Sequence, residues 1–138
     1  MDIRQITPDY AVSPQIQAQD IPALKAAGFC SIMCNRPDDE EFGQPEFDSI
    51  AQAARDAGLE VRCVPIVSGM VTPQAAQEFA TALDEMPKPM LAYCRSGTRC
   101  TMLWSIVSHG KLSGEDIINA TRNAGYDMAG LVRQLDRG

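Results

Sequence analysis

Short apolar runs alternate with helical segments along this chain, and this alternation limits the folds that the chain can adopt. The predicted strands are residues 3–6, 10–13, 29–34, 59–64 and 90–93. The predicted helices are residues 21–27, 46–57, 73–86, 99–108, 114–124 and 128–135. Because strands and helices alternate with short connections, the pattern predicts right-handed βαβ units. We therefore expect an α/β fold of three layers, with a mostly parallel sheet flanked by helices.

Residues at the predicted helix ends support this division. Asp20, Thr72 and Ser113 each precede a helical segment and are of the type that accepts a hydrogen bond from the first turn. Asp127 stands in the same position before the last helix. We therefore expect these four side chains to act as N-caps.

Length and charge limit the possible partners. The chain has 138 residues, which suits one domain over residues 1–138 with a hydrophobic core of its own. We see no apolar run near the roughly 18–20 residues that span a bilayer, and no pattern of a signal peptide at residues 1–4. The net charge of −6 argues against nucleic acid, because phosphate backbones attract basic surfaces. We expect no membrane and no nucleic-acid partner.

The cysteines point to free thiols. There are 5 cysteines, an odd number, and none are spaced as Cys-x-x-Cys. This disfavours a disulfide framework and a structural zinc site, and it favours the reducing cytoplasm. With His109 as the single histidine, a histidine-rich metal centre is excluded, so we expect no metal and no cofactor. Cys30, Cys34 and Cys63 lie in predicted strands, where buried small hydrophobic side chains are expected.

Cys94 stands at the carboxyl end of the predicted strand 90–93, where sites form in parallel sheets. A tight turn after it would aim the amides of residues 95–99 at the sulfur, at the start of a helix. Arg99 and Arg95 add positive charge, and these effects favour the thiolate. A fall in the pKa from about 8.5 to about 6 would raise the thiolate fraction at pH 7 from roughly 3% to roughly 90%.

These residues predict a nucleophilic site without a histidine base. Cys94 and Arg99 are the expected catalytic residues. The expected anion-binding residues are Arg95, Ser96, Gly97 and Thr98. Cys100 is a possible redox partner of Cys94, since a second thiol nearby could form a disulfide with it; the alternative is a core position.

The loop Tyr-Cys-Arg-Ser-Gly-Thr-Arg, Tyr93 to Arg99, resembles the active-site loop of rhodanese sulfurtransferases, Cys-Arg-x-Gly-x-Arg or -Thr. The surrounding chain resembles the dual-specificity tyrosine phosphatase scaffold, at Tyr10–Ser13, at Asn35-Arg36 and at Val64-Pro65-Ile66. This combination is similar to the phosphatase-like domain family of beta-lactamase hydrolase-like (Blh) proteins. The resemblance implies a (phosphotyrosine protein) phosphatase-like fold. It also implies sulfur transfer, with a separate persulfide dioxygenase as the implied partner, since this domain is joined to such an enzyme in some bacteria.

Two departures from the phosphatase pattern favour sulfur chemistry. Tyrosine phosphatases use Cys-x5-Arg, whereas Cys94 and Arg99 enclose four residues. Phosphatases also place an aspartate general acid in a separate loop, and the corresponding segment Val67–Met70 has no carboxylate. We therefore expect a sulfurtransferase in which Cys94 takes sulfur from thiosulfate or a persulfide and passes it to a thiol, cyanide or sulfite.

Two alternatives remain open at this stage. One is a cysteine-dependent phosphatase or other hydrolase of the dual-specificity type, and the other is a non-catalytic anion-binding module. The acidic run Asp38–Glu41 is expected to be a solvated loop. Its functional interpretation is a displaced general acid, which would favour the phosphatase.

Overall fold

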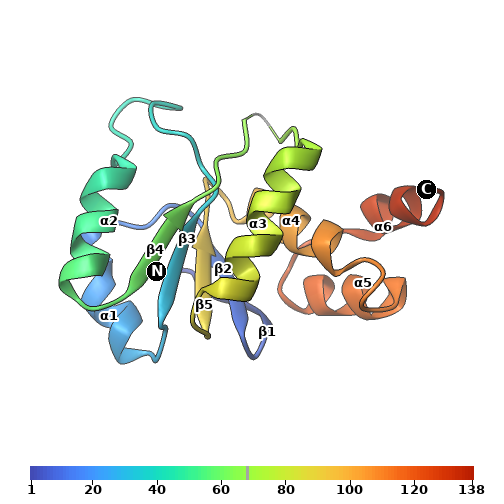
Figure 1. Cartoon of the computed structure of the whole chain (residues 1–138), viewed down its shortest axis with the longest axis horizontal. Coiled ribbons are helices and arrows are strands. Elements are labelled where there is room, and N and C mark those ends of the chain that lie inside the picture. Colours follow the sequence, from blue (N-terminus) through green and yellow to red (C-terminus); the bar gives the residue numbers. More distant parts are fainter. Residues whose placement is uncertain (68) are drawn as a thin grey trace.

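The computed structural model of the chain describes residues 1–67 and 69–138 and has a five-stranded sheet at its centre (Figure 1). The strands are β1 (Arg4–Thr7), β2 (Tyr10–Ser13), β3 (Ser31–Cys34), β4 (Glu60–Cys63) and β5 (Met90–Tyr93). Their order is β1-β2-β5-β3-β4. β1 pairs with β2 in antiparallel fashion, and the other neighbours are parallel. The predicted mostly parallel sheet is confirmed.

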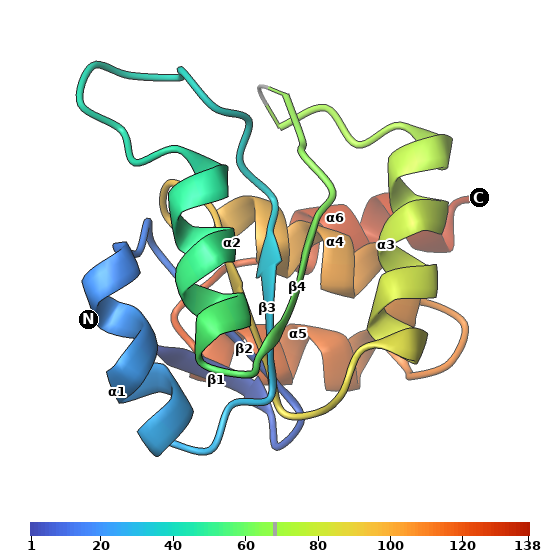
Figure 2. The same ribbon diagram turned by 60° about the vertical axis from the view of Figure 1, so that its left-hand side comes forward.

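Helices cover both faces of this sheet. They are α1 (Ile21–Ala26), α2 (Phe47–Asp56), α3 (Pro73–Glu85), α4 (Thr98–Ser108), α5 (Gly114–Asn123) and α6 (Ala129–Asp136), with a short 3-10 turn, η1 (Ala18–Asp20), before α1. Figure 1 shows α1 and α2 on one side of the strands and α3 to α6 on the other, and Figure 2 shows the same division from another direction. The three-layer α/β fold predicted from the alternation of elements is therefore confirmed.

Successive side chains of each strand point to opposite faces of the sheet, where they join two separate hydrophobic cores. Ile32 and Leu91 pack on the side of α1 and α2. Met33 and Ala92 pack on the side of α3 to α6, together with Trp104. All four residues of β2, β3 and β5 are buried, which explains why these strands read as continuous runs rather than as alternating ones. Burial on both faces holds β5, the strand before Cys94, in the middle of the sheet.

Most of the predicted helix caps are present. Thr72 Oγ1 accepts a hydrogen bond from the Ala75 amide at 3.1 Å, and Ser113 Oγ accepts one from the Asp116 amide at 3.1 Å. Asp127 Oδ1 accepts one from the Ala129 amide at 3.1 Å, at the start of α6. The prediction for Asp20 is wrong. Its carboxylate turns back to the Gln17 amide, 2.8 Å away, because a 3-10 turn precedes α1 there.

All five cysteines are free thiols. Cys34 is buried as predicted, but Cys30 and Cys63 are only half-buried, because β4 is the edge strand and Cys30 precedes β3. Within the described ranges, no helix has the length and apolar character needed to cross a bilayer.

Candidate active site around Cys94

The central strand and the helix after it set the position of Cys94. Cys94 directly follows β5, and α4 begins four residues later at Thr98. Gly97 precedes the helix with φ 90° and ψ −9°, in the left-handed region that favours glycine. The turn therefore reverses direction between strand and helix within a few residues. It leaves the N-terminus of α4 next to the sulfur.

The sulfur of Cys94 lies in a nest of hydrogen-bond donors. The Gly97 amide donates to Sγ at 3.1 Å, and Cys94 has no exposed surface. The pKa of Cys94 is lowered to about 5, chiefly by a hydrogen bond from the Cys100 thiol. Burial opposes this shift, and the backbone amides of Cys100, Ser96 and Arg99 add to it. At that pKa roughly 99% of the Cys94 side chain is thiolate at pH 7.

Cys100 is the partner thiol of Cys94. It lies in the first turn of α4 and is fully buried, and burial raises its pKa well above the ordinary value. Cys100 therefore remains a neutral thiol, and its hydrogen bond favours the thiolate form of Cys94. The structure brings the two side chains together, and the redox role of Cys100 stays a prediction.

Arg99 is held by the carboxylate of Glu40, which lies in the loop after β3. Its Nη1 and Nη2 donate to the two oxygens of Glu40, both at 2.8 Å, and Nη1 also donates to the Ile66 carbonyl at 2.7 Å. Such a two-pronged pair fixes the plane of the guanidinium. The hydrogen bonds from Arg99, and next those from Arg36, hold the pKa of Glu40 below its usual value. Glu40 is therefore ionised at neutral pH.

Residues Asp38–Glu41 are exposed, as expected of a solvated loop. The Glu40 side chain is nevertheless only 23% exposed, because it pairs with Arg99 and Arg36. The loop is folded inward by Gln44, which accepts a hydrogen bond from the Glu40 amide at 3.0 Å and donates one to the Pro37 carbonyl at 2.8 Å. The polar run signalled a loop, but sequence alone did not show that two arginines attract one of its carboxylates.

Arg36 is a site residue that sequence reasoning missed. It lies two residues beyond β3, and the last residue of β3, Cys34, is level with Tyr93 of β5. Its side chain is 1% exposed; Nε donates to Glu40 at 2.8 Å and Nη1 donates to Gln15 at 3.0 Å. A signal was available, because a charged residue just after a strand covered on both faces lies at the carboxyl edge of the sheet.

Arg36 and Glu40 line a pocket of about 340 Å³ together with Arg95 and Arg99 of the turn that follows Cys94. Arg95 is the outermost of these, with its side chain 69% exposed and Nη2 3.5 Å from Glu41. Three guanidinium groups thus line the pocket with one carboxylate, and two of them, Arg36 and Arg99, pair with it. Such a pocket is suited to binding anions.

The rest of the turn is braced by local hydrogen bonds. Ser96 Oγ donates to Thr98 Oγ1 at 2.9 Å, and the Tyr126 hydroxyl donates to the Ser96 carbonyl at 2.9 Å. A Cβ on Gly97 would collide with that hydroxyl, so the approach of Tyr126 requires glycine. Tyr126 is a second residue that sequence reasoning missed, since it lies in the link between α5 and α6, far from Cys94 in sequence.

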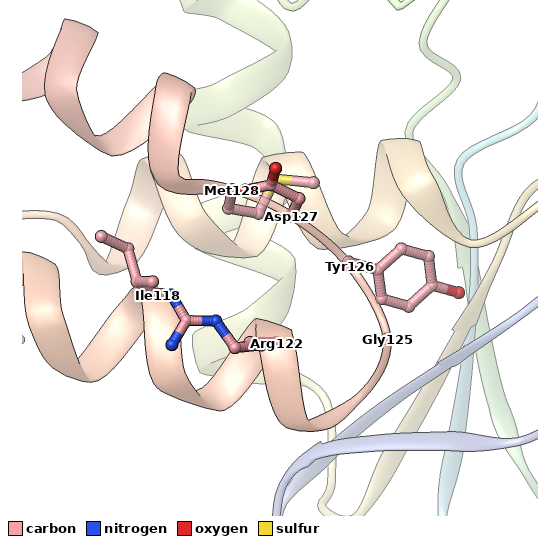
Figure 3. A pocket seen from close by; sticks show the side chains of 6 residues that line it. All are labelled: Ile118, Arg122, Gly125, Tyr126, Asp127 and Met128. Carbon is pink, nitrogen blue, oxygen red and sulfur yellow. The ribbon is translucent and has the colours of Figure 1, made fainter.

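Figure 3 shows Tyr126 projecting from this link towards the strands, away from the side chains of Arg122 and Ile118. A second hollow lies behind it, lined by Ile118, Arg122, Gly125, Tyr126, Asp127 and Met128. It shares no residue with the arginine-lined pocket. The hollow and the arginine-lined pocket are therefore two distinct pockets.

The segment Val67–Met70, where an aspartate acid would stand in a phosphatase, is only partly described. Ser68 lies outside the described residues, and the side chains of Val67 and Met70 are exposed. The carboxylate that reaches the site comes instead from the loop after β3.

Comparison with known proteins places this site in a family. Residues 2–111 match the model of the beta-lactamase hydrolase-like protein, phosphatase-like domain. Beta-lactamase hydrolase-like proteins of Agrobacterium fabrum and Xylella fastidiosa are 30% and 32% identical over 135 and 139 residues. These matches cover 96% and 99% of this chain but 31% and 32% of the relatives. The chain therefore spans about a third of the length of those curated relatives.

Solved structures share the whole fold. A putative phosphatase from Neisseria meningitidis is 30% identical with a TM-score of 0.85, and the match covers 99% of this chain and 98% of the other. Tk-PTP shares the fold with a TM-score of 0.71 and 17% identity, and the match covers 96% of this chain and 94% of the other. The core catalytic domain of the PP-IP phosphatase SIW14 from S. cerevisiae also shares it, with a TM-score of 0.69 and 16% identity. That match covers 99% of this chain and 84% of the other. The resemblance that the sequence suggested is confirmed.

These similarities favour the phosphatase alternative over the expected sulfur transfer, for which they give no support. The thiolate turn, its arginine and the five-stranded sheet all lie on a scaffold shared with phosphatases. The chain belongs to the phosphatase-like domain family of beta-lactamase hydrolase-like proteins.

Proposed function

We propose that this domain is a cysteine-dependent phosphatase that hydrolyses phosphate monoesters or anhydrides. The observation that carries the proposal is the Cys94 thiolate, with a pKa of about 5, beside an arginine-lined pocket. The Neisseria meningitidis protein that shares the fold over nearly its whole length is described as a putative phosphatase. A thiolate at neutral pH attacks phosphorus without help from a base.

The reaction takes two steps on Cys94. The thiolate attacks the phosphorus of the substrate, an S–P bond forms, and the P–O bond to the leaving group breaks with its electron pair on the leaving oxygen. Water then attacks the cysteinyl phosphate, releasing inorganic phosphate, and Cys94 leaves as the thiolate. The Gly97 amide stabilises the negative charge on Sγ of Cys94, and the Arg99 guanidinium stabilises the charge on the phosphoryl oxygens in both steps.

The protonation state of Glu40 narrows the choice of substrate. A leaving alkoxide needs a proton from a general acid, but Glu40 is ionised because Arg99 and Arg36 lower its pKa. Glu40 is the carboxylate that lines the described pocket. We therefore propose substrates whose leaving oxygen is weakly basic, such as aryl phosphates, acyl phosphates and phosphoanhydrides.

Steady-state hydrolysis of 4-nitrophenyl phosphate tests the proposal. The native protein should release nitrophenolate, and Cys94→Ser should reduce kcat by at least about 10³-fold, because the nucleophile is lost. Cys30→Ser is the matched control, since Cys30 is half-buried and lies before β3 at the opposite end of that strand. Hydrolysis that persists in Cys94→Ser, or is absent from the native protein, would overturn the proposal.

Sulfur transfer remains the second candidate, favoured by one observation. Cys94 and Arg99 enclose four residues, one fewer than in the tyrosine phosphatase loop that the sequence was compared with. A smaller turn suits a persulfide sulfur better than a phosphoryl group. A protein that takes up one sulfur from thiosulfate on Cys94 but leaves aryl phosphates intact would support this candidate.

Free thiols on all five cysteines suit the reducing cytoplasm that we propose for either activity.

A further inference from the structure

Arg36 is a buried cation with an unused hydrogen-bond donor. Its Nη2 is buried and has no hydrogen-bond partner in the part of the chain that the structure describes. Nη2 forms an ion pair with Glu41 Oε1 at 3.3 Å, but without hydrogen-bond geometry. A buried guanidinium N–H that donates no hydrogen bond is unfavourable. It therefore marks a place where an acceptor from a ligand would be stabilised.

The rest of the Arg36 side chain is fixed, so the free donor has a defined direction. Nε donates to Glu40 at 2.8 Å and Nη1 donates to Gln15 at 3.0 Å. Arg36 also lines the pocket that contains Arg99 and Arg95. The pocket is thus already organised around Arg36.

Two carboxylates of the chain itself pair with the arginines of this pocket, and Glu40 also lines it. Glu40 pairs with Arg99 and Arg36 at 2.8 Å, close to the thiolate. Glu41 lies between Arg36, at 3.3 Å, and the exposed Arg95, at 3.5 Å. Its side chain is half exposed, so a ligand can displace it at little cost. The two carboxylates mark two neighbouring anion positions rather than one.

We propose that the pocket has a second anion subsite, formed by Arg36 and Arg95, next to the subsite of Cys94 and Arg99. The substrate then carries a second anionic group, a phosphate or a carboxylate, a short distance from the reacting phosphoryl group. This inference rests on the proposed function only in assigning the first subsite to a phosphoryl group. Both groups displace internal carboxylates, Glu40 at the first subsite and Glu41 at the second.

Calorimetric binding to the Cys94→Ser protein tests this proposal without any turnover. The probes are inorganic phosphate, pyrophosphate and phosphonoacetate, each titrated at one ionic strength. We expect pyrophosphate or phosphonoacetate to bind at least about tenfold more tightly than phosphate. The order of these two probes distinguishes a second phosphate from a second carboxylate. Equal affinity of all three probes, or no binding of any, would overturn the proposal.

Variants in the same Cys94→Ser background assign the effect to Arg36. Arg36→Gln should abolish the preference for the double anions over phosphate. Glu41→Gln should strengthen binding of the double anions, because it neutralises the competing carboxylate. Arg55→Gln, which removes an exposed arginine of α2, is the control with the same change in charge. A preference that survives in folded Arg36→Gln would contradict the proposal.

Glu41→Gln keeps the proposal testable if Arg36→Gln fails to fold, because Glu41 is exposed and contributes little to the core. No gain in Glu41→Gln would then count against the second subsite. Hydrolysis by the native protein is measured separately. Its absence, with the binding preference intact, would overturn the proposed phosphatase and leave the second subsite standing.

Discussion

Glu40 accepts two hydrogen bonds from the guanidinium of Arg99, one from Nη1 and one from Nη2, both at 2.8 Å. Arg99 is the residue expected to bind the anionic substrate next to Cys94. The internal carboxylate and the substrate must therefore compete for the same donors. The relationship joins the loop after β3 to the first turn of α4, two segments 59 residues apart in sequence.

Substitution of Glu40 tests this competition. Glu40→Gln should lower KM for 4-nitrophenyl phosphate by about tenfold with kcat nearly unchanged, because Arg99 no longer holds an internal anion. The measurement is steady-state hydrolysis beside Glu78→Gln, a control on the exposed face of α3. A fall in kcat of about 10²-fold or more would instead show that Glu40 takes part in proton transfer or orients Arg99 for the reaction.

The pH dependence follows from the lowered pKa of Cys94. The reactive form is the thiolate, so kcat/KM should rise with pH through about 5 and then level off. The same thiolate links stability to pH. The folded pKa lies below the unfolded value of about 8.5, so its contribution is fully present above about 8.5 and is lost as pH falls towards 5.

The titration is read directly from the ultraviolet absorbance of the thiolate, and Cys94→Ser supplies the baseline. An absorbance step near pH 8.5 that disappears in Cys94→Ser would contradict the lowered pKa. A profile of kcat/KM that keeps rising up to pH 8 would do the same.

Cys100 should control the acidity of Cys94. The hydrogen bond from its thiol is the largest cause of the lowered pKa, so Cys100→Ala should raise the pKa of Cys94 by about one unit or more. Cys100→Ser is the matched variant because its hydroxyl keeps a donor of similar size. The thiolate titration of both variants is the measurement. If Cys100→Ala and the native protein titrate alike, the amides alone stabilise the thiolate.

Gly97 should tolerate no side chain. It has φ 90°, and a Cβ there would meet the Tyr126 hydroxyl that donates to the Ser96 carbonyl. Gly97→Ala should therefore lower the free energy of unfolding by about 1–3 kcal/mol and impair hydrolysis. Chemical denaturation measures the first effect. Gly138→Ala, at the exposed C-terminus, is a control at another glycine with positive φ, and native-like stability and activity in Gly97→Ala would refute the account of the turn.

The fold could be predicted from the sequence because its helices and strands are short and their ends are marked by local residue patterns. Strands such as β5 lie buried between helices on both faces, so their composition is visible as unbroken apolar runs. Thr72 and Ser113 are caps that act within three residues, and such local interactions are readable from sequence. Asp20 was misread because a 3-10 turn competes for the same carboxylate.

The site could be predicted only in part, because some of its contacts join residues that are far apart in the sequence. Cys94 to Arg99 form one continuous turn, and its donors follow from local geometry. Arg36 and Glu40 reach the site from the loop after β3, and Tyr126 reaches it from the link between α5 and α6. Their side chains meet only after the sheet has assembled. The preference for sulfur chemistry rested on the four-residue spacing between Cys94 and Arg99 and on a missing carboxylate at Val67–Met70. The structure supplies a carboxylate from another loop, although an ionised one.

The mass of the covalent intermediate on Cys94 tests the central claim most directly. The native protein is mixed with 4-nitrophenyl phosphate in one experiment and with thiosulfate in another, quenched rapidly, and its intact mass is recorded beside that of Cys94→Ser. We predict a gain of one phosphoryl group from the aryl phosphate, absent from Cys94→Ser. A gain of one sulfur atom from thiosulfate, removable by cyanide, together with no phosphoryl gain, would contradict the phosphatase account.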